Sequence, residues 1–362
     1  MEMNIKPVFE NLKRPVLIAG PCSAETEEQV MRTAEQLADK NIDLFRAGIW
    51  KPRTRPNSFE GIGRDGLRWL KQVKETYGLK TTVEVANTQH VFESLKAGVD
   101  VLWIGARTTV NPFSVQEVAD ALEGIDIPVL VKNPINPDLS LWIGAIERMY
   151  KAGISRIGII HRGFSTYGKS VYRNVPRWEI ALELKRRYPD LQLIVDASHI
   201  CGNRTLLRDI SQQALDLNYD GVMLETHIDP DNAWSDAAQQ VTPLGFQEIV
   251  DRLIIRELKS NSKEYQENIH ELRNQIDNID REIMHLLGDR MKLSEDIGNY
   301  KKLNNISIYQ PDRWNEIIET VVKKGEDQGL SGDFIRKVFT AIHEESINHQ
   351  AKIMNETIEV KS

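Results

Sequence analysis

Short apolar runs rich in β-branched residues recur along the first 250 or so positions, and stretches with helical periodicity separate them. Eight runs predict strands, at residues 16–19, 42–45, 81–85, 101–104, 129–131, 157–160, 193–195 and 222–224. Helical patterns occupy intervening segments such as 27–40, 66–77, 88–97 and 177–187. Eight strands that alternate with helices over this length predict an α/β fold, the TIM (β/α)8 barrel.

A doubly wound open sheet is the structural alternative to the barrel, since it also alternates strands and helices. Such sheets usually carry a glycine-rich dinucleotide-binding turn after the first strand. Here the corresponding turn reads Gly20-Pro21-Cys22-Ser23, which is not that fingerprint. The pattern therefore favours the barrel.

The pattern changes after Leu258, where a polar stretch at 259–263 reads as a linker. Apolar residues then recur at a spacing of three and four, at Ile269, Leu272, Ile276, Ile279, Ile283, Leu286, Leu293 and Ile297. This seam predicts one long helix, and two further helices are expected at about 312–324 and 331–354. We therefore expect a barrel domain at 1–258, a linker at 259–263 and a small all-α three-helix domain at 264–362.

One charge interrupts the apolar seam of the long helix, at Arg290. A buried arginine needs an anionic partner, which here is a ligand or a carboxylate. Lys301 lies eleven residues on, close to the same face, whereas Arg273 points elsewhere on the helix. In the last helix, Ser346 and Gln350 share a face because they are four residues apart.

Composition narrows the function classes. The chain has 362 residues, 41% of them hydrophobic, and a formal net charge of −7, so general nucleic-acid binding is not expected. No apolar run approaches the roughly 20 residues of a membrane span, and the N-terminus has no signal-peptide shape. Two cysteines do not make a disulfide framework. We expect a cytoplasmic protein with no nucleic-acid or membrane partner.

Polar and charged residues follow every predicted strand. In a barrel they meet at the C-terminal mouth, where chemistry takes place. They include Cys22, Arg46, Lys51, Arg53, Glu84, Arg107, Lys132, His161, Arg162, Asp196, His199, Glu225 and His227. So many cations at one mouth predict one or two substrates rich in negative charge.

Four residues near these strand ends form a possible metal set: Cys22, His199, Glu225 and Asp236. A thiolate, an imidazole and carboxylates suit a borderline divalent ion such as Mn²⁺, Fe²⁺, Co²⁺ or Zn²⁺ better than Mg²⁺ or Ca²⁺. Cys201, two residues past His199, is a rival ligand that spacing alone does not exclude.

The ordered motifs of the barrel region resemble the family of 3-deoxy-D-arabino-heptulosonate 7-phosphate synthases, in its shorter form. The matching stretches are Ala19-Gly20-Pro21-Cys22-Ser23, Arg46 with Lys51-Pro52-Arg53-Thr54, Gly105-Ala106-Arg107-Thr108-Thr109, Lys132-Asn133, His161-Arg162-Gly163, Asp196-Ala197-Ser198-His199 and Glu225-Thr226-His227 with Ser235-Asp236. Related synthases that make an eight-carbon sugar acid carry an Asn-Arg version of the turn at 52–54. Pro52-Arg53-Thr54 therefore favours erythrose 4-phosphate as the sugar substrate.

The resemblance implies a role for each matched residue. Phosphoenolpyruvate is held by Arg46, Lys51, Arg107, Lys132 and Arg162 with the backbone of Gly105 and Ala106, and the sugar phosphate by Pro52, Arg53 and Thr54. One divalent ion, Mn²⁺ being favoured, binds Cys22, His199, Glu225 and Asp236. Lys51 is the candidate to protonate the alkoxide formed in the condensation. Which group activates the water stays open.

The C-terminal region resembles the all-helical chorismate mutases. The matches are Leu272-Arg273, Asp289-Arg290, 298–301, Asp312-Arg313 and Glu345-Ser346 with Gln350. The resemblance implies a homodimer in which Arg273 enters the partner's site. Arg273, Arg290 and Arg313 then bind the chorismate carboxylates, Ser346 also contacts the ligand, and Lys301 and Gln350 bind the ether oxygen, with no cofactor. Two positions depart from the family: Trp314 replaces a Glu that contacts the substrate hydroxyl, and Gln310 replaces an Asp.

Two hypotheses of different class follow for the whole chain. The first is a bifunctional enzyme with synthase and mutase activities. The second is a synthase whose helical domain is an inactive module for dimerisation and for sensing chorismate or prephenate. Only about fifteen residues precede Val16, so the resemblance implies that control of the synthase, if present, lies in the C-terminal domain.

Overall fold

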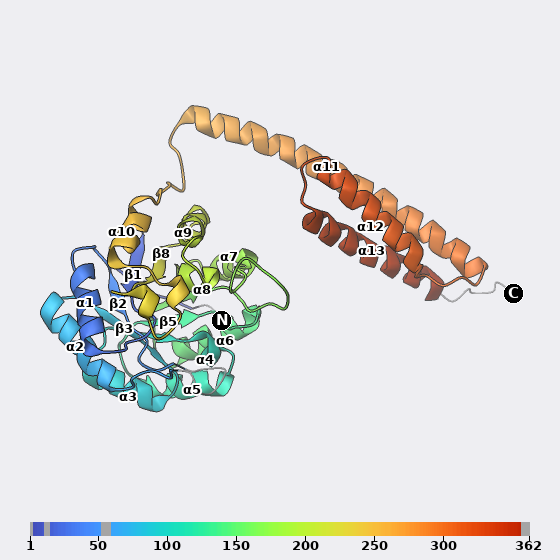
Figure 1. Ribbon diagram of the computed structural model, residues 1–362. Helices are drawn as coiled ribbons and strands as arrows, with labels where there is room; N and C mark the ends of the chain where they lie inside the picture. The colour runs from blue at the N-terminus through green and yellow to red at the C-terminus, as the bar shows by residue number, and fades with distance from the viewer. Residues whose placement is uncertain (1–2, 11–14, 52–58, 356–362) are drawn as a thin grey trace. The chain divides into compact units, whose positions relative to one another are not determined.

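The computed structural model describes residues 3–10, 15–51 and 59–355. The chain divides into two compact units, Met1–Leu258 and Lys259–Ser362 (Figure 1). The first unit is an α/β barrel, and the second contains three helices. Each unit is described by itself below.

Eight parallel strands form the barrel. Each strand pairs with its neighbours in chain order, and β1 also pairs with β8, so the sheet is closed. The strands are β1 (Val16–Gly20), β2 (Leu44–Arg46), β3 (Thr81–Val85), β4 (Val101–Ile104), β5 (Val129–Lys132), β6 (Ile157–His161), β7 (Gln192–Asp196) and β8 (Gly221–Glu225). Closure confirms the predicted barrel and excludes the doubly wound sheet. All eight predicted runs are strands, with ends shifted by up to two residues.

Helices follow the strands and form the outer layer. They are α1 (Glu27–Leu37), α2 (Asp65–Tyr77), α3 (Thr88–Ala97), α4 (Ala106–Thr109), α5 (Pro112–Ala121), α6 (Leu139–Lys151), α7 (Trp178–Arg187), α8 (Ala197–Cys201), α9 (Leu207–Asp216) and α10 (Pro243–Asp251). Short polar side chains begin several of them by accepting hydrogen bonds from free backbone amides, as Thr26, Asn87, Asn111 and Asp138 do. The same residues that break the apolar pattern thus set where the helices begin.

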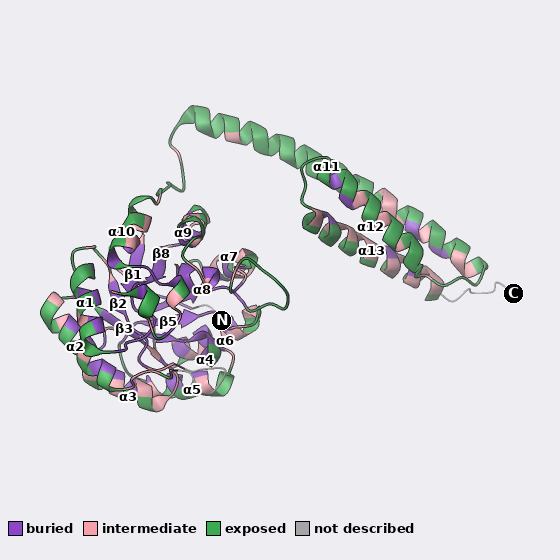
Figure 2. Cartoon of the chain, viewed as in Figure 1, coloured by how far each residue is buried: buried purple, intermediate pink, exposed green. Residues whose placement is uncertain are grey.

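The barrel has two apolar layers because its strands are buried on both faces (Figure 2). Inside the barrel pack Val16, Ile18, Leu44, Val101, Trp103, Leu130, Ile160, Ile194 and Met223. Val8 and Phe9, which precede β1, pack against this interior group. The second layer joins the strands to the surrounding helices. The filled interior leaves the mouth at the carboxyl ends of the strands for chemistry.

The second unit consists of α11 (Lys263–Leu303), α12 (Pro311–Glu326) and α13 (Gly332–Asn355). The Ser262 side chain accepts a hydrogen bond from the Tyr265 amide and caps α11. The first residue of α11, Lys263, is the last residue of the predicted linker. Helices α11 and α13 pack closely because Gly298 lets Gln350 approach: a Cβ at position 298 would lie 3.2 Å from the Gln350 Cα. The described residues contain no helix that is both long and apolar enough to span a bilayer.

Much of the apolar seam of α11 is exposed within one chain (Figure 2). Each of its side chains from Leu272 onward is between 48% and 66% exposed, at Leu272, Ile276, Ile279, Ile283, Leu286, Leu293 and Ile297. Contiguous exposed apolar surface of this kind usually marks an interaction site. The exposed seam is therefore a candidate interaction surface.

Gly20 allows β1 and β2 to approach at the mouth, and its replacement by alanine tests that constraint. Its φ is +137°, and a Cβ would lie 2.1 Å from the Arg46 carbonyl oxygen. We expect Gly20→Ala to lower the barrel's unfolding free energy by about 3 kcal/mol, from backbone strain plus the clash. Gly98→Ala is the matched control: φ is +75° and nothing lies within 4 Å, so about 1 kcal/mol is expected.

Urea unfolding followed by tryptophan fluorescence measures both variants. The signal reports mainly on the barrel, because Trp314 is the one tryptophan of seven that lies after residue 258. Equal losses in the two variants would show that the contact with the Arg46 carbonyl is not the constraint.

Candidate active sites

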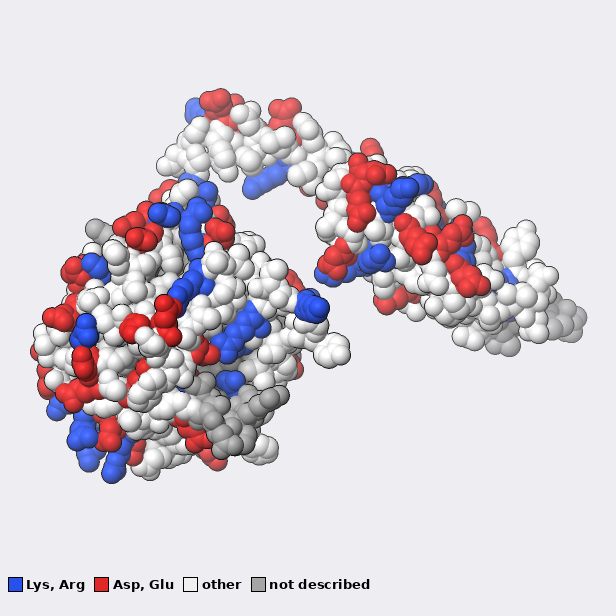
Figure 3. Space-filling view, viewed as in Figure 1, with Lys and Arg blue, Asp and Glu red and all other residues white. Residues whose placement is uncertain are grey.

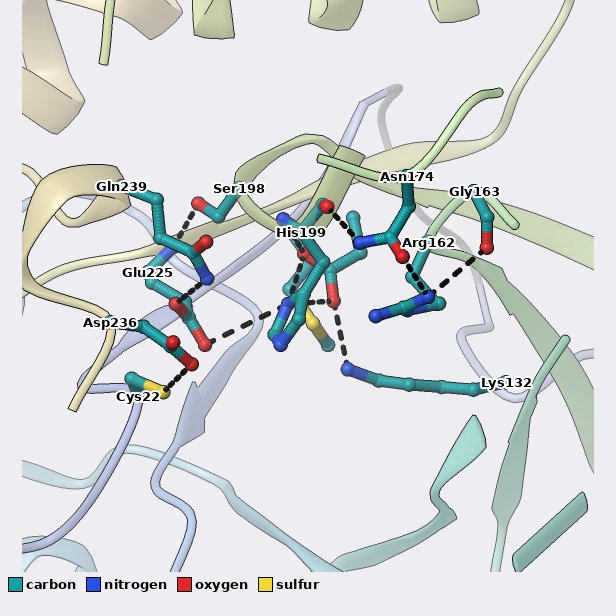
Figure 4. A network of polar contacts seen from close by, with 12 residues as sticks. Cys22, Lys132, Arg162, Gly163, Asn174, Ser198, His199, Glu225, Asp236 and Gln239 are labelled. Atoms are coloured by element: carbon teal, nitrogen blue, oxygen red, sulfur yellow. Dashed lines mark hydrogen bonds and ion pairs between the residues drawn. The ribbon is translucent and has the colours of Figure 1, made fainter. Parts of the chain in front are cut away.

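Three candidate metal ligands converge at the mouth of the barrel. Cys22 follows β1, Glu225 ends β8, and Asp236 precedes the short helix η2 (Ala237–Gln239). One ligand atom from each lies within 4.8 Å of the other two, and the Cys22 thiol is 3.2 Å from Asp236 Oδ2 (Figure 4). A sulfur and two carboxylates fit a borderline divalent ion. The structure thus brings together three of the four predicted ligands.

His199, the fourth predicted ligand, lies beside this cluster on α8. Its Nδ1 is 3.0 Å from Asp196 Oδ1 and 3.8 Å from Glu225 Oε1 (Figure 4). A histidine metal ligand commonly uses one ring nitrogen while a carboxylate holds the other, which here leaves Nε2 for a metal. Cys201, the rival ligand, is buried at the end of α8 and is not in the cluster of described residues.

The charges of the cluster suit a cation. Burial, followed by the charge of Glu225, raises the pKa of the Cys22 thiol to about 12. Burial acts in the same direction on Asp236, but Arg173, His199 and Lys51 hold the pKa of that carboxyl well below its usual range. The carboxylates are therefore ionised and the thiol is protonated, so a metal ion would bind with release of the thiol proton.

Two of the predicted phosphoenolpyruvate-binding cations are buried in ion pairs. Arg46 Nη1 lies 3.1 Å from Glu225 Oε1, and Lys132 Nζ donates to Asp196 Oδ2 at 2.8 Å. Both cations also lie over the ring of Trp103, 5.1 Å and 5.5 Å from its centroid. Each contact favours the charged form of a side chain that is almost fully withdrawn from water.

Arg162 is the third buried cation of the mouth. Its Nη1 donates to Asn174 Oδ1 at 2.6 Å, a neutral acceptor. Burial lowers the pKa of Arg162 to about 10; the charge of Asp196 acts in the opposite direction, and the charges of Arg173 and Arg107 lower the pKa further. Mutually repelling cations in a buried setting are stabilised by an anion. Figure 3 shows Lys and Arg side chains gathered on this face near α8.

Gly105, which precedes α4, is held against a carboxylate. A Cβ at position 105 would lie 1.9 Å from Glu84 Oε1, and Glu84 Oε2 accepts from the Trp103 indole at 3.0 Å. Only glycine fits there, because any side chain at position 105 would overlap the Glu84 carboxylate.

Lys51, one of the predicted phosphoenolpyruvate-binding cations, contacts the cluster of Cys22, Glu225 and Asp236 through Cys22. Its Nζ donates to the Cys22 carbonyl oxygen at 2.8 Å and lies 2.9 Å from the Cys22 thiol. The predicted sugar-phosphate residues Pro52, Arg53 and Thr54 lie outside the described residues.

The structure adds residues to which the sequence had assigned no role. Asp196 joins Lys132 to His199, and Gln239 Nε2 donates to Glu225 Oε2 at 2.6 Å (Figure 4). Arg173 Nη1 binds Asp236 Oδ1 at 2.9 Å, and Asn174 holds Arg162. Asp196 was visible as a polar residue at a strand end. Arg173 and Asn174 lie in the irregular segment between β6 and α7, and Gln239 ends the short helix η2, so none of them carries a periodic signal.

The second site lies between α11 and α13. Arg290 Nη1 donates to the Ser346 hydroxyl, and the buried Gln350 packs at Gly298. Lys301 Nζ donates to the Ile308 carbonyl oxygen at 2.5 Å. Burial lowers the pKa of both Arg290 and Lys301. These four residues form a cationic site with amide and hydroxyl groups beside it.

Two predicted arginines do not join this group through the contacts of one chain. Arg273 is exposed and lies 17 residues before Arg290, which is roughly 25 Å along the helix axis. Arg313, on α12, is exposed and pairs with Glu316 at 2.6 Å. A single chain therefore presents part of the predicted carboxylate clamp.

Fold and sites together define an enzyme with two separate places for anionic substrates, one beside a metal-type cluster in a barrel and one in a helical unit. Residues 10–263 match the DAHP synthetase I family, and residues 272–351 match chorismate mutase type II. The chain belongs to the DAHP synthetase I family and also carries a chorismate mutase domain.

Individual relatives agree with this assignment for the barrel. A phospho-2-dehydro-3-deoxyheptonate aldolase of Thermotoga maritima is 30% identical over 237 residues, covering 66% of this chain and 68% of the relative. Its crystal structure has a TM-score of 0.60 at 30% identity and covers 66% of this chain and 67% of that one. A 2-dehydro-3-deoxyphosphooctonate aldolase of Wolinella succinogenes is 29% identical over 265 residues, covering 66% of this chain and 98% of the relative.

Replacing Asp196 tests the buried network of the mouth. Asp196→Asn leaves Lys132 without a counter-charge, and removing one partner of a buried pair costs about 3–5 kcal/mol. Asp231→Asn is the matched control, since Asp231 pairs with Arg204 on the surface and is worth about 0–1 kcal/mol. Urea unfolding of the two variants gives the comparison. A loss below 1 kcal/mol for Asp196→Asn would contradict the assigned role.

Proposed function

We propose that the chain is a bifunctional cytoplasmic enzyme of the shikimate pathway. The barrel condenses phosphoenolpyruvate with erythrose 4-phosphate to 3-deoxy-D-arabino-heptulosonate 7-phosphate, and the helical unit converts chorismate to prephenate. The observation that carries the first activity is the convergence of buried Arg46, Lys132 and Arg162 on the cluster of Cys22 and Glu225. The match at 272–351 carries the second.

Phosphoenolpyruvate, nearly trianionic, is the substrate for the buried cations. Arg46 and Lys132 already face carboxylates across the mouth, so the anion enters a site whose positive groups are in place. Arg162 and the exposed Arg107 complete the cationic wall. Gly105 and Ala106 follow directly on the carboxyl end of β4, so their backbone amides are further proposed donors to the anion.

A divalent ion held by Cys22, Glu225, Asp236 and the Nε2 of His199 would polarise the sugar aldehyde. Mn²⁺ is our preferred ion, and Fe²⁺, Co²⁺ and Zn²⁺ fit the same donors. Carbon 3 of phosphoenolpyruvate attacks the aldehyde carbon, and Lys51 gives a proton to the resulting alkoxide. Water then adds at carbon 2, and phosphate leaves. Lys51 suits the proton transfer because its Nζ reaches the Cys22 thiol.

Erythrose 4-phosphate is proposed from residues 52–54 of the sequence alone. The barrel's relatives include aldolases named for both the seven-carbon and the eight-carbon sugar acid, at 30% and 29% identity. Pro52 favours the seven-carbon product, with Arg53 and Thr54 on the sugar phosphate. Arabinose 5-phosphate is the competing substrate in any assay.

In the helical unit, Arg290 and Arg313 bind the chorismate carboxylates together with the partner subunit's Arg273. Lys301 and Gln350 bind the ether oxygen, and Ser346 orients Arg290. Cationic and amide donors stabilise the charge that develops as the ether bond breaks. The rearrangement needs no cofactor.

We propose that a second copy of the chain packs on the exposed apolar seam of α11. Ile276, Ile279 and Ile283 recur at coiled-coil spacing and are about half exposed in the single chain. Pairing of two α11 helices buries them, and it also brings the distant Arg273 to a site that one chain leaves incomplete.

The alternative is that the helical unit has no turnover and only dimerises and senses chorismate or prephenate. The contact of Arg290 with Ser346 and the burial of Gln350 beside α11 support turnover. Under both hypotheses we propose that ligand at the helical unit lowers synthase activity.

The test is a pair of assays on the full chain. We expect a chelator to abolish condensation with erythrose 4-phosphate while mutase turnover continues, since the candidate metal cluster found among the described residues lies in the barrel. Added prephenate should lower the synthase rate at an unchanged metal concentration.

Equal loss of both activities on chelation would contradict separate sites. Absence of mutase turnover at saturating chorismate would favour the alternative, in which the helical unit only dimerises and senses ligand. Faster reaction with arabinose 5-phosphate would overturn the sugar assignment.

Mixing two inactive variants tests the shared mutase site. Arg273→Ala and Arg290→Ala should each lose mutase activity by at least a hundredfold, because each leaves a carboxylate without its cation. Co-expressed heterodimers contain one intact site, so a statistical mixture should recover about a quarter of the unmodified activity. Arg281→Ala is a control, since Arg281 contacts only its own helix among described residues. Activity no higher than the parents' average would refute sharing.

A further inference from the structure

His343, on α13, is a polar residue of the second site that none of the predicted roles uses. Its ring stacks on Trp314 with centroids 4.1 Å apart and planes 12° apart, and Tyr309 lies at 6.2 Å (Figure 1 shows α12 beside α13). Its Nε2 is buried and has no hydrogen-bond partner among the described residues. An orphaned buried nitrogen held by a rigid stack is unusual, since such groups are normally satisfied.

The position of His343 on α13 directs it to the mutase site. It precedes Ser346 by three residues and Gln350 by seven, so the three share one helix face. Ser346 contacts Arg290, and Gln350 contacts α11 at Gly298. His343 thus shares a helix face with two of the proposed substrate-binding groups, and the charges of Arg290 and Lys301 act on its ring.

Charge fixes the form of the ring. Burial lowers the pKa of His343, the positive charges of Arg290 and Lys301 lower it further, and Glu344 acts weakly in the opposite direction. The imidazole is therefore neutral near pH 7, with one nitrogen that donates and one that accepts. Arg290 and Lys301 can only donate, and the indole of Trp314 can only donate. A substrate hydroxyl that donates needs an acceptor. The oxygens of Ser346 and Gln350 can accept, and the neutral imidazole of His343 is a further acceptor in this group.

We propose that His343 Nε2 binds the hydroxyl group of chorismate, with Trp314 as the positioning residue that holds the imidazole flat. This inference rests on the proposed mutase function. It accounts for the orphaned Nε2, and it gives a physical meaning to the departure at position 314. Trp314 cannot accept a hydrogen bond, but its ring packs against His343, which can.

The experiment compares two substrates on the full-length enzyme: chorismate, and an analogue that lacks the ring hydroxyl. His343→Phe keeps an aromatic ring to stack on Trp314 and removes Nε2. We expect this variant to lower kcat/KM for chorismate roughly tenfold, the worth of one hydrogen bond, and to leave the analogue nearly unchanged. His343→Gln, which retains an acceptor, should recover part of the loss.

His349→Phe is the matched control. It lies on the same helix, and its ring pairs with Glu295 and Glu345, so the ratio between the two substrates should not change. Equal loss for both substrates in His343→Phe, or no recovery in His343→Gln, would overturn the proposal and leave His343 a packing residue. Absence of turnover in the unmodified enzyme would instead overturn the proposed function itself.

Discussion

The buried ion pairs at the barrel mouth are the constraint on which the first site depends. Arg46 faces Glu225, and Lys132 faces Asp196, all four side chains being nearly inaccessible to water. Charges in such a place are tolerated only in pairs, since an unpaired buried charge costs several kcal/mol. The pairs keep the mouth polar and rigid before substrate arrives. The carboxylate of Glu225 also belongs to the metal-type cluster, so cation and anion binding share one framework.

This sharing has a chemical consequence. A metal ion on Glu225 would reduce the negative charge that Arg46 meets, which frees the guanidinium to attract the substrate anion. Asp196 is likewise shared by two partners, since Lys132 contacts Oδ2 and the Nδ1 of His199 lies 3.0 Å from Oδ1 and 2.9 Å from Oδ2. Under the proposed function, occupation of the metal site and affinity for the anion would thus be linked through groups that lie side by side.

The sequence predicts the barrel well because each strand is a continuous apolar run, and closure explains why many strand-end residues meet at one mouth. His161 is an exception, since its ring packs among Trp142, Trp178 and Tyr219 in the layer between strands and helices. The contacts of Asp236 with Arg173 and of Arg162 with Asn174 could not be predicted in this way. Both partners lie between β6 and α7, where no period ties sequence to position. The rings of Trp314 and His343 are likewise 29 residues apart in sequence, and only the packing of α12 on α13 reveals their contact.

The helical unit shows a different dependence. Its charged groups are less buried than those of the barrel, and its longest helix exposes an apolar seam, which under the proposed function a second chain would cover. A helix of 41 residues gains little from intrinsic propensity and needs packing along its length. Burial of the seam by a second chain would exclude water near Arg290 and Lys301. The same step that completes the core then strengthens every electrostatic contact to the substrate.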